Sequence, residues 1–174
     1  SLKKLNGVLK ELPTVQKVIL IDNHNSDEIN PNFEFNSYSE ILDSTPKPIQ
    51  FEQLPFDHPL YIMYSSGTTG LPKSIVHSAG GTLLQHFKEL HFHCDLKKED
   101  TIFYFTTCGW MMWNWLVSAL SIGSTVVLYD GSPFYPDGKE MWKLAEKLEF
   151  SVFGTSAKYI DACRENSIFP STFS

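Results

Sequence analysis

The amino-acid sequence predicts an α/β protein with a layered, largely parallel sheet and flanking helices. Between residues 60 and 165, short runs of β-branched and aromatic residues alternate with stretches of helical periodicity. Such alternation is typical of a parallel sheet that has helices on its faces. The chain has 174 residues, 42% of them hydrophobic, which is enough to bury a core and suits one domain better than two.

Charge and hydropathy exclude two classes of partner. The chain has 14 Lys and Arg against 20 Asp and Glu, a net charge of −6, and no basic run longer than a pair. Nucleic-acid-binding proteins concentrate basic charge on one face, so we expect no nucleic-acid partner. No apolar run approaches the roughly 18 residues of a membrane span, so we expect no membrane partner.

The cysteines and the first residues indicate a cellular location. Cys94, Cys108 and Cys163 are odd in number and lack CxxC spacing, so they do not make a disulfide framework. Residues 1–13 (SLKKLNGVLKELP) lack the apolar core of a signal peptide. We therefore expect a cytoplasmic (cytosolic) protein.

The first 56 residues contain two regular elements and a long connection. Apolar residues at helical spacing predict a helix over residues 2–12, which Pro13 ends. Residues 15–21 (VQKVILI) are short and β-branched, and predict a buried strand. Residues 22–56 are rich in Asn, Asp, Ser and Pro, and we expect an irregular connecting stretch with a brief helix at residues 38–42.

Regular alternation follows from residue 60. The expected strands are 60–64, 74–77, 101–105, 125–129 and 151–153, and the expected helices are 80–93, 112–122, 139–148 and 157–165. Residues 166–174 (NSIFPSTFS) contain no predicted closing element. We therefore expect the fold to continue beyond them, with residues 1–174 forming part of a larger domain.

Residues 64–74 (YSSGTTGLPKS) form the most specific motif. Small residues let backbone N–H groups approach an anion, hydroxyl groups add donors, and Lys73 supplies positive charge. The alternative is a flexible surface turn, which has no need of a Lys after a rigid Pro. The motif is not a Walker A loop, because Pro72 precedes Lys73. The predicted phosphate-binding residues are Ser65, Ser66, Gly67, Thr68, Thr69, Gly70 and Lys73.

This motif and the following IVHSAGGT resemble the phosphate-loop signature of the adenylate-forming superfamily, which includes acyl-CoA synthetases, luciferases and peptide-synthetase adenylation domains. Ser74 departs from the usual Gly of that signature. Residues 106–115 (TTCGWMMWNW), 128–137 (LYDGSPFYPD) and 153–160 (FGTSAKYI) are similar to the branch of this superfamily that activates acetoacetate. The resemblance implies that the chain is a partial AMP-binding domain, part of the large N-terminal domain of that fold.

The resemblance also implies the reaction: an ATP-dependent acid–thiol ligase that forms an acyl-adenylate and transfers the acyl group to CoA. The implied substrates are ATP, acetoacetate and CoA, with Mg²⁺ as cofactor, in the use of ketone bodies for lipid synthesis. Thr68, Thr69 and Lys73 are then expected at the β- and γ-phosphates. An acetyl- or propionyl-CoA synthetase-like ligase is the alternative within the superfamily.

Four residues are expected near the acyl substrate. Trp110, Met111 and Met112 match a segment that the superfamily uses around the acyl group and the thiol, although Met and Trp at helical spacing are also typical of a core. His77 stands where the superfamily has a His, so we expect it beside the substrate. The alternative is that His77 is a hydrogen-bonded residue of the core. Lys158 matches the pattern weakly, and a solvated Lys on a helix is the alternative.

No metal site and no catalytic residue are predicted in this segment. His86, His91, His93 and Cys94 are possible zinc ligands by type, but neighbouring residues near a helix end point in different directions and no second ligand cluster exists. The superfamily's adenine, ribose and lid motifs are also absent. The segment is therefore expected to be inactive alone, and a nucleotide-binding fragment without turnover or a structural fragment remain alternatives.

Overall fold

The computed structural model describes residues 2–21, 34–42, 45–65 and 70–173. It divides into two compact units, Ser1–Glu52 and Gln53–Ser174, each of which is described by itself. Ser66, Gly67, Thr68 and Thr69 of the predicted phosphate loop lie outside the described residues.

The first unit contains helix α1 (Leu2–Lys10), strands β1 (Lys17–Leu20) and β2 (Glu34–Ser37), and the short helix α2 (Tyr38–Leu42). The two strands pair in parallel, with Lys17 opposite Glu34. β2 lies within the stretch 22–56 that was expected to be irregular; its sequence, EFNS, is too polar and too short to predict a strand. The prediction that β1 is buried is wrong: Ile19 is exposed, and only the alternate residues Val18 and Leu20 are half-buried.

The second unit begins with a hairpin of β3 (Pro59–Ser65) and β4 (Lys73–Ser78). Both strands and the loop between them were predicted, but their pairing is antiparallel, with Ser65 opposite Lys73. The connection is too short for the crossover that a parallel pair requires. Ser78 then caps helix α3 (Ala79–Phe87) by accepting a hydrogen bond from the backbone N–H of Gly81, and a π-helical turn extends this helix over Lys88–His93.

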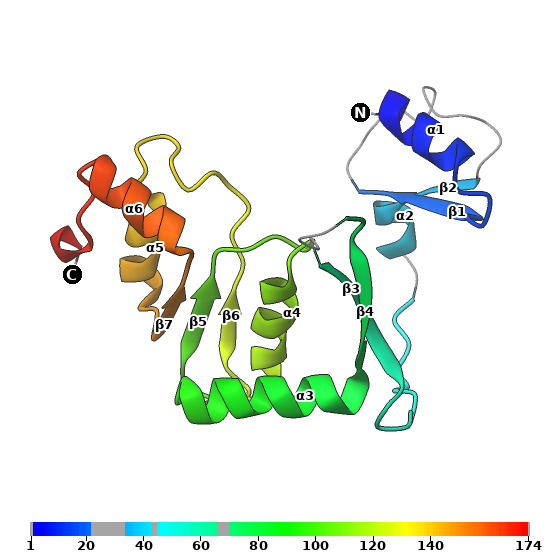
Figure 1. Ribbon diagram of the computed structural model, residues 1–174, viewed down its shortest axis with the longest axis horizontal. Helices are drawn as coiled ribbons and strands as arrows, with labels where there is room; N and C mark the ends of the chain where they lie inside the picture. The colour runs from blue at the N-terminus through cyan, green and yellow to red at the C-terminus, as the bar shows by residue number, and fades with distance from the viewer. Residues whose placement is uncertain (1, 22–33, 43–44, 66–69, 174) are drawn as a thin grey trace. The chain divides into compact units, whose positions relative to one another are not determined.

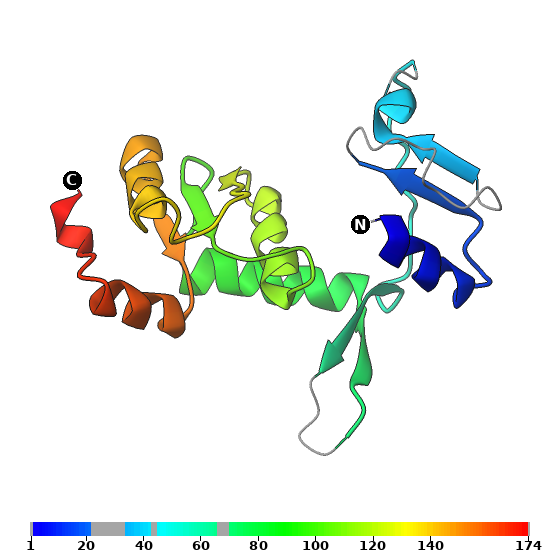
Figure 2. The same cartoon turned by 90° about the horizontal axis from the view of Figure 1, so that it is seen from above.

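A three-stranded parallel sheet confirms the predicted fold class. β5 (Thr101–Tyr104) lies between β6 (Thr125–Val127) and β7 (Val152–Gly154). Two helices connect these strands: α4 (Met111–Val117), which continues as a 3-10 turn over Ser118–Ser121, and α5 (Glu140–Leu148). Helix α6 (Ala157–Glu165) follows the last strand. Figure 1 shows α4 on one side of the sheet and α5 and α6 on the other, and Figure 2 gives the view from above.

The core of the second unit lies on both faces of β5. Ile102 faces a cluster that contains residues of α3's extension and α4, whereas Phe103 faces a cluster that contains residues of α5 and α6. Successive strand residues point to opposite faces, so one strand anchors both layers. The first cluster consists of Leu90, Leu96, Ile102, Trp115, Leu116 and Ala119, and the second of Phe103, Met141, Tyr159, Cys163 and Ile168.

The end of the chain adds more structure than the sequence predicted. Ile168 is buried in the second cluster, and a short 3-10 turn follows at Pro170–Thr172. Among the helices of the described residues, none is both long enough and apolar enough to cross a membrane.

Candidate functional site

The ends of the predicted phosphate loop meet at one end of the β3–β4 hairpin. Ser65 and Lys73 lie opposite each other in the register, and the side chain of Lys73 is exposed. Gly70 has φ of +149°, a backbone conformation that residues with side chains rarely adopt. The described residues thus place the predicted lysine beside the start of the loop.

A cavity of about 430 Å³ lies among β4, α3 and α4, and we call it the α3 cavity. Val76, Met111 and Trp115 give it apolar walls. Its polar lining includes His77, Thr82, His86 and Glu89. The cavity therefore brings together His77 and Met111, two residues that the sequence analysis placed near the acyl substrate.

His86 is buried on the face of α3 that lines this cavity. Its Nδ1 lies 2.8 Å from the hydroxyl oxygen of Ser118, which itself donates to the carbonyl oxygen of Asn114 at 2.9 Å. A hydroxyl has one proton to donate, so Nδ1 of His86 is the donor to Ser118. Burial lowers the pKa of His86, Glu89 opposes this shift and His77 adds to it, so the imidazole is neutral at neutral pH.

The carboxylate of Glu89 is held by two hydrogen bonds. It accepts one from Nε2 of Gln85 at 2.6 Å and one from Nε1 of Trp115 at 3.0 Å. Charge-assisted bonds of this kind fix the carboxylate in place. The bond from Trp115 also ties the extension of α3 to α4, and both border the α3 cavity.

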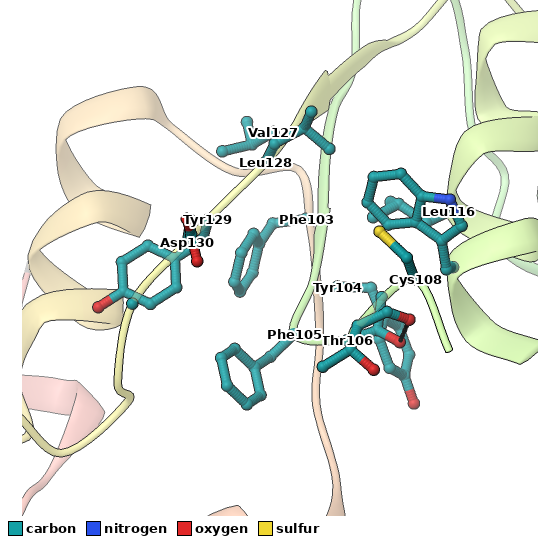
Figure 3. Close-up of a pocket in the computed structure, with 13 residues that line it drawn as sticks. Phe103, Tyr104, Phe105, Thr106, Cys108, Leu116, Val127, Leu128, Tyr129 and Asp130 are labelled. Carbon is teal, nitrogen blue, oxygen red and sulfur yellow. Dashed lines mark hydrogen bonds between the residues drawn. The ribbon is translucent and has the colours of Figure 1, made fainter. Parts of the chain in front are cut away.

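A second cavity, of about 500 Å³, lies at the carboxyl ends of β5 and β6 (Figure 3). Phe103 and Phe105 face Tyr129, at ring-centroid distances of 6.4 and 6.3 Å. Residues 106–108 and 128–131 meet here, although about twenty residues separate them in the sequence. Ligands of parallel α/β sheets bind beyond the carboxyl ends of the strands, which makes this edge a second candidate surface.

Trp110, Met112 and Lys158 do not line the α3 cavity. Trp110 precedes α4 and is 51% exposed, whereas Met112 is half-buried and packs against the first core cluster. Lys158 lies exposed in the first turn of α6. None of the three lines either cavity, and their roles stay predictions.

Thr82 and the cavity-lining role of His86 were missed by sequence reasoning, which considered His86 with His91, His93 and Cys94 as metal ligands. Within the part of the chain that the structure describes, no group of three or more His, Cys, Asp or Glu could hold a metal ion. The available signal was spacing: Thr82, His86 and Glu89 recur at i, i+4 and i+7, on one helix face.

Known proteins match nearly the whole chain. The AMP-binding enzyme family matches residues 1–172. Acetoacetyl-coenzyme A synthetase of Rhizobium meliloti (strain 1021) is 65% identical over 123 residues, which are 71% of this chain and 19% of that protein. Acetoacetyl-CoA synthetase of Gallus gallus is 48% identical over 179 residues, covering 97% of this chain and 26% of that protein.

Solved structures agree with these matches. Acetoacetyl-CoA synthetase from Streptomyces lividans is 44% identical with a TM-score of 0.85, over 98% of this chain and 26% of that one. The luciferase-like enzyme of the mealworm Zophobas morio, at 21% identity and a TM-score of 0.72, shares the fold over 99% of this chain and 38% of that one. The chain spans about a quarter of the length of the curated relatives it matches. The chain belongs to the AMP-binding enzyme family.

Proposed function

We propose that the whole protein is an ATP-dependent acid–thiol ligase that activates acetoacetate and transfers it to CoA. The observation that supports this most is the match over 97% of the chain, at 48% identity, to a protein named acetoacetyl-CoA synthetase. The alternative within the family is a ligase for acetate or propionate.

The proposed reaction has two steps. A carboxylate oxygen of acetoacetate attacks the α-phosphorus of ATP, and the bond to pyrophosphate breaks to give acetoacetyl-adenylate. The sulfur of CoA then attacks the acyl carbon, AMP leaves and the thiol gives up its proton. Both steps depend mainly on positioning and on neutralising the charge of the leaving group.

Lys73 is the described residue best suited to neutralise that charge. It lies exposed at the end of the hairpin, next to the loop, and none of the described residues forms a hydrogen bond or ion pair with its ammonium group. We propose that this group binds the oxygens of the departing pyrophosphate, together with the loop residues Thr68 and Thr69.

We propose that Mg²⁺ accompanies ATP in this reaction. The described residues offer no cluster of carboxylates, imidazoles or thiolates that could hold it.

The α3 cavity is proposed as the acyl-binding pocket. Its lining by His77 and Met111 supports this, because the resemblance to the adenylate-forming superfamily implies that both residues lie near the substrate. The apolar walls suit a short acyl chain.

We further propose a cytosolic enzyme that channels ketone bodies into lipid synthesis. The three free cysteines support a reducing compartment. Immunoblotting of cytosolic and organelle fractions for the protein tests the location, and recovery from an oxidising compartment would contradict it.

Turnover by the whole protein with ATP, CoA and a panel of acids tests the proposed function. The acids are acetate, propionate, acetoacetate and butyrate, and formation of AMP and acyl-CoA is measured. We expect acetoacetate to give the highest kcat/KM, and the 174-residue chain alone to give no turnover. Turnover confined to acetate or propionate would contradict the substrate, and ATP binding without adenylate would favour a nucleotide-binding fragment.

A further inference from the structure

On the basis of the proposed ligase function, we propose that the α3 cavity binds the neutral end of a 3-oxo acid. In this arrangement the hydroxyl group of Thr82 donates a hydrogen bond to the 3-oxo oxygen, and Thr82 thereby determines which acids are activated.

The first observation is the placement of buried polar groups. Thr82 and His86 are both buried, and both line this cavity. Thr82 is 8% exposed, and its Oγ1 has no hydrogen-bond partner among the described residues. A buried hydroxyl without a partner loses its bonds to water, so a ligand oxygen that accepts from it gains affinity. Thr divides between two χ1 rotamers in a helix, so the direction of its hydroxyl is adjustable.

The second observation is the charge of the cavity, which disfavours an anion. Glu89 contributes a carboxylate and His86 is a neutral ring that donates through Nδ1 to Ser118. The first backbone N–H groups of α3 are already paired, so the helix N-terminus offers no open anion site. These bonds are Ala79 to the carbonyl of His58, Gly80 to the carbonyl of Phe56, and Gly81 to the hydroxyl of Ser78. Besides His86, His77 is the one basic side chain among the described residues that line the cavity, and it shares that lining with the carboxylate of Glu89. The cavity therefore suits the ketone end of acetoacetate better than its carboxylate.

The third observation is the contrast between the hydroxyl and the walls. Val76, Met111 and Trp115 present apolar surface for the terminal methyl group. Butyrate has nearly the shape of acetoacetate but carries a methylene in place of the ketone, so it leaves Thr82 unpaired. Sites that hydrogen-bond a substrate group discriminate strongly against analogues that lack it.

Kinetics of Thr82 variants of the whole protein test this inference. Thr82→Val keeps the shape of the side chain and removes the donor, so we expect kcat/KM for acetoacetate to fall about 10- to 100-fold while that for butyrate stays or rises. Thr82→Ser keeps a hydroxyl, and we expect it to retain the preference for acetoacetate. Thr82→Ala serves as a second variant without a donor, and circular dichroism checks that each variant folds.

The outcomes separate this inference from the proposed function. An unchanged acetoacetate-to-butyrate ratio in Thr82→Val and Thr82→Ala, with normal acetoacetate turnover by the wild type, would overturn the role of Thr82 alone. A change confined to the KM for CoA would also overturn it, because the cavity would then bind the thiol substrate. A wild-type protein that does not activate acetoacetate would overturn the proposed function and this inference together.

Discussion

Two residues show how position sets chemistry in this chain. Lys73 begins β4 opposite Ser65 and is exposed, so its charge is available to an anion at the loop. His86 is buried against Ser118, so its ring is held neutral and in one tautomer. The sequence could predict the role of Lys73, because its motif is local. It could not predict the state of His86, because that depends on Ser118, thirty-two positions away.

At the residue scale, Lys73→Ala in the whole protein is expected to slow carboxylate-dependent exchange of pyrophosphate into ATP about 100-fold. The reason is that the substitution removes the positive charge that we propose neutralises the leaving pyrophosphate. Lys97→Ala removes the same charge from an exposed surface ion pair with Asp95 and is the matched control, with exchange near the wild-type rate. Exchange by Lys73→Ala at the wild-type rate would contradict the assignment.

A second prediction at this scale concerns pH. Burial lowers the pKa of His86 in the folded protein below its ordinary value, so the unfolded chain binds the proton more tightly. The contribution of His86 to the free energy of unfolding is therefore fully present above about pH 6.5 and is lost as the pH falls below that value. The test is urea unfolding of the wild type and of His86→Asn, whose amide can still donate to Ser118, at pH 7.5 and pH 5. We expect the free energy of unfolding of His86→Asn to fall less between these two pH values than that of the wild type. An equal loss in both proteins would refute this origin.

The elements differ in how well the sequence predicts them. β5 and α6 were predicted almost to the residue, because both faces of β5 are buried and Ser156 caps α6 by accepting from the N–H of Tyr159. β2 was missed because pairing with β1, and not its own composition, makes it a strand. The α3 cavity could not be predicted, since β4, α3 and α4 form it only after they pack.

At the element scale, Ile102→Ala is expected to lower the free energy of unfolding by about 2–5 kcal/mol. Ile102 is fully buried on β5, and its removal leaves a cavity in the first core cluster. Ile102→Val is the matched control and is expected to cost about 0.5–1.5 kcal/mol. Urea unfolding measures both, and equal stability of Ile102→Ala and the wild type would contradict the position of β5 in the core.

The whole chain exposes much apolar surface. Leu84 and Phe92 on α3 and its extension are 65% and 72% exposed, and Ile62 and Val76 on the hairpin are 61% and 58% exposed. Surface of this kind marks sites of interaction.

The net charge of −6 on these 174 residues opposes the anionic substrates that we propose, so their attraction would depend on local groups such as Lys73.

At the scale of the molecule, the 174-residue chain by itself is expected to bind a hydrophobic fluorescent dye strongly. The whole protein, measured at equal molar concentration, is expected to bind much less, because we propose that its other parts cover these side chains. Equal dye fluorescence from both proteins would contradict this prediction, because the apolar side chains would then be exposed in the whole protein as well.

Isotope exchange by the whole protein tests acetoacetate activation most directly. Labelled pyrophosphate is incubated with ATP, Mg²⁺ and each acid in the absence of CoA, and label in ATP is measured. We predict exchange that requires acetoacetate and exceeds that with acetate, propionate or butyrate. Exchange with acetate or propionate but not with acetoacetate, or no exchange with any acid, would contradict the proposed function.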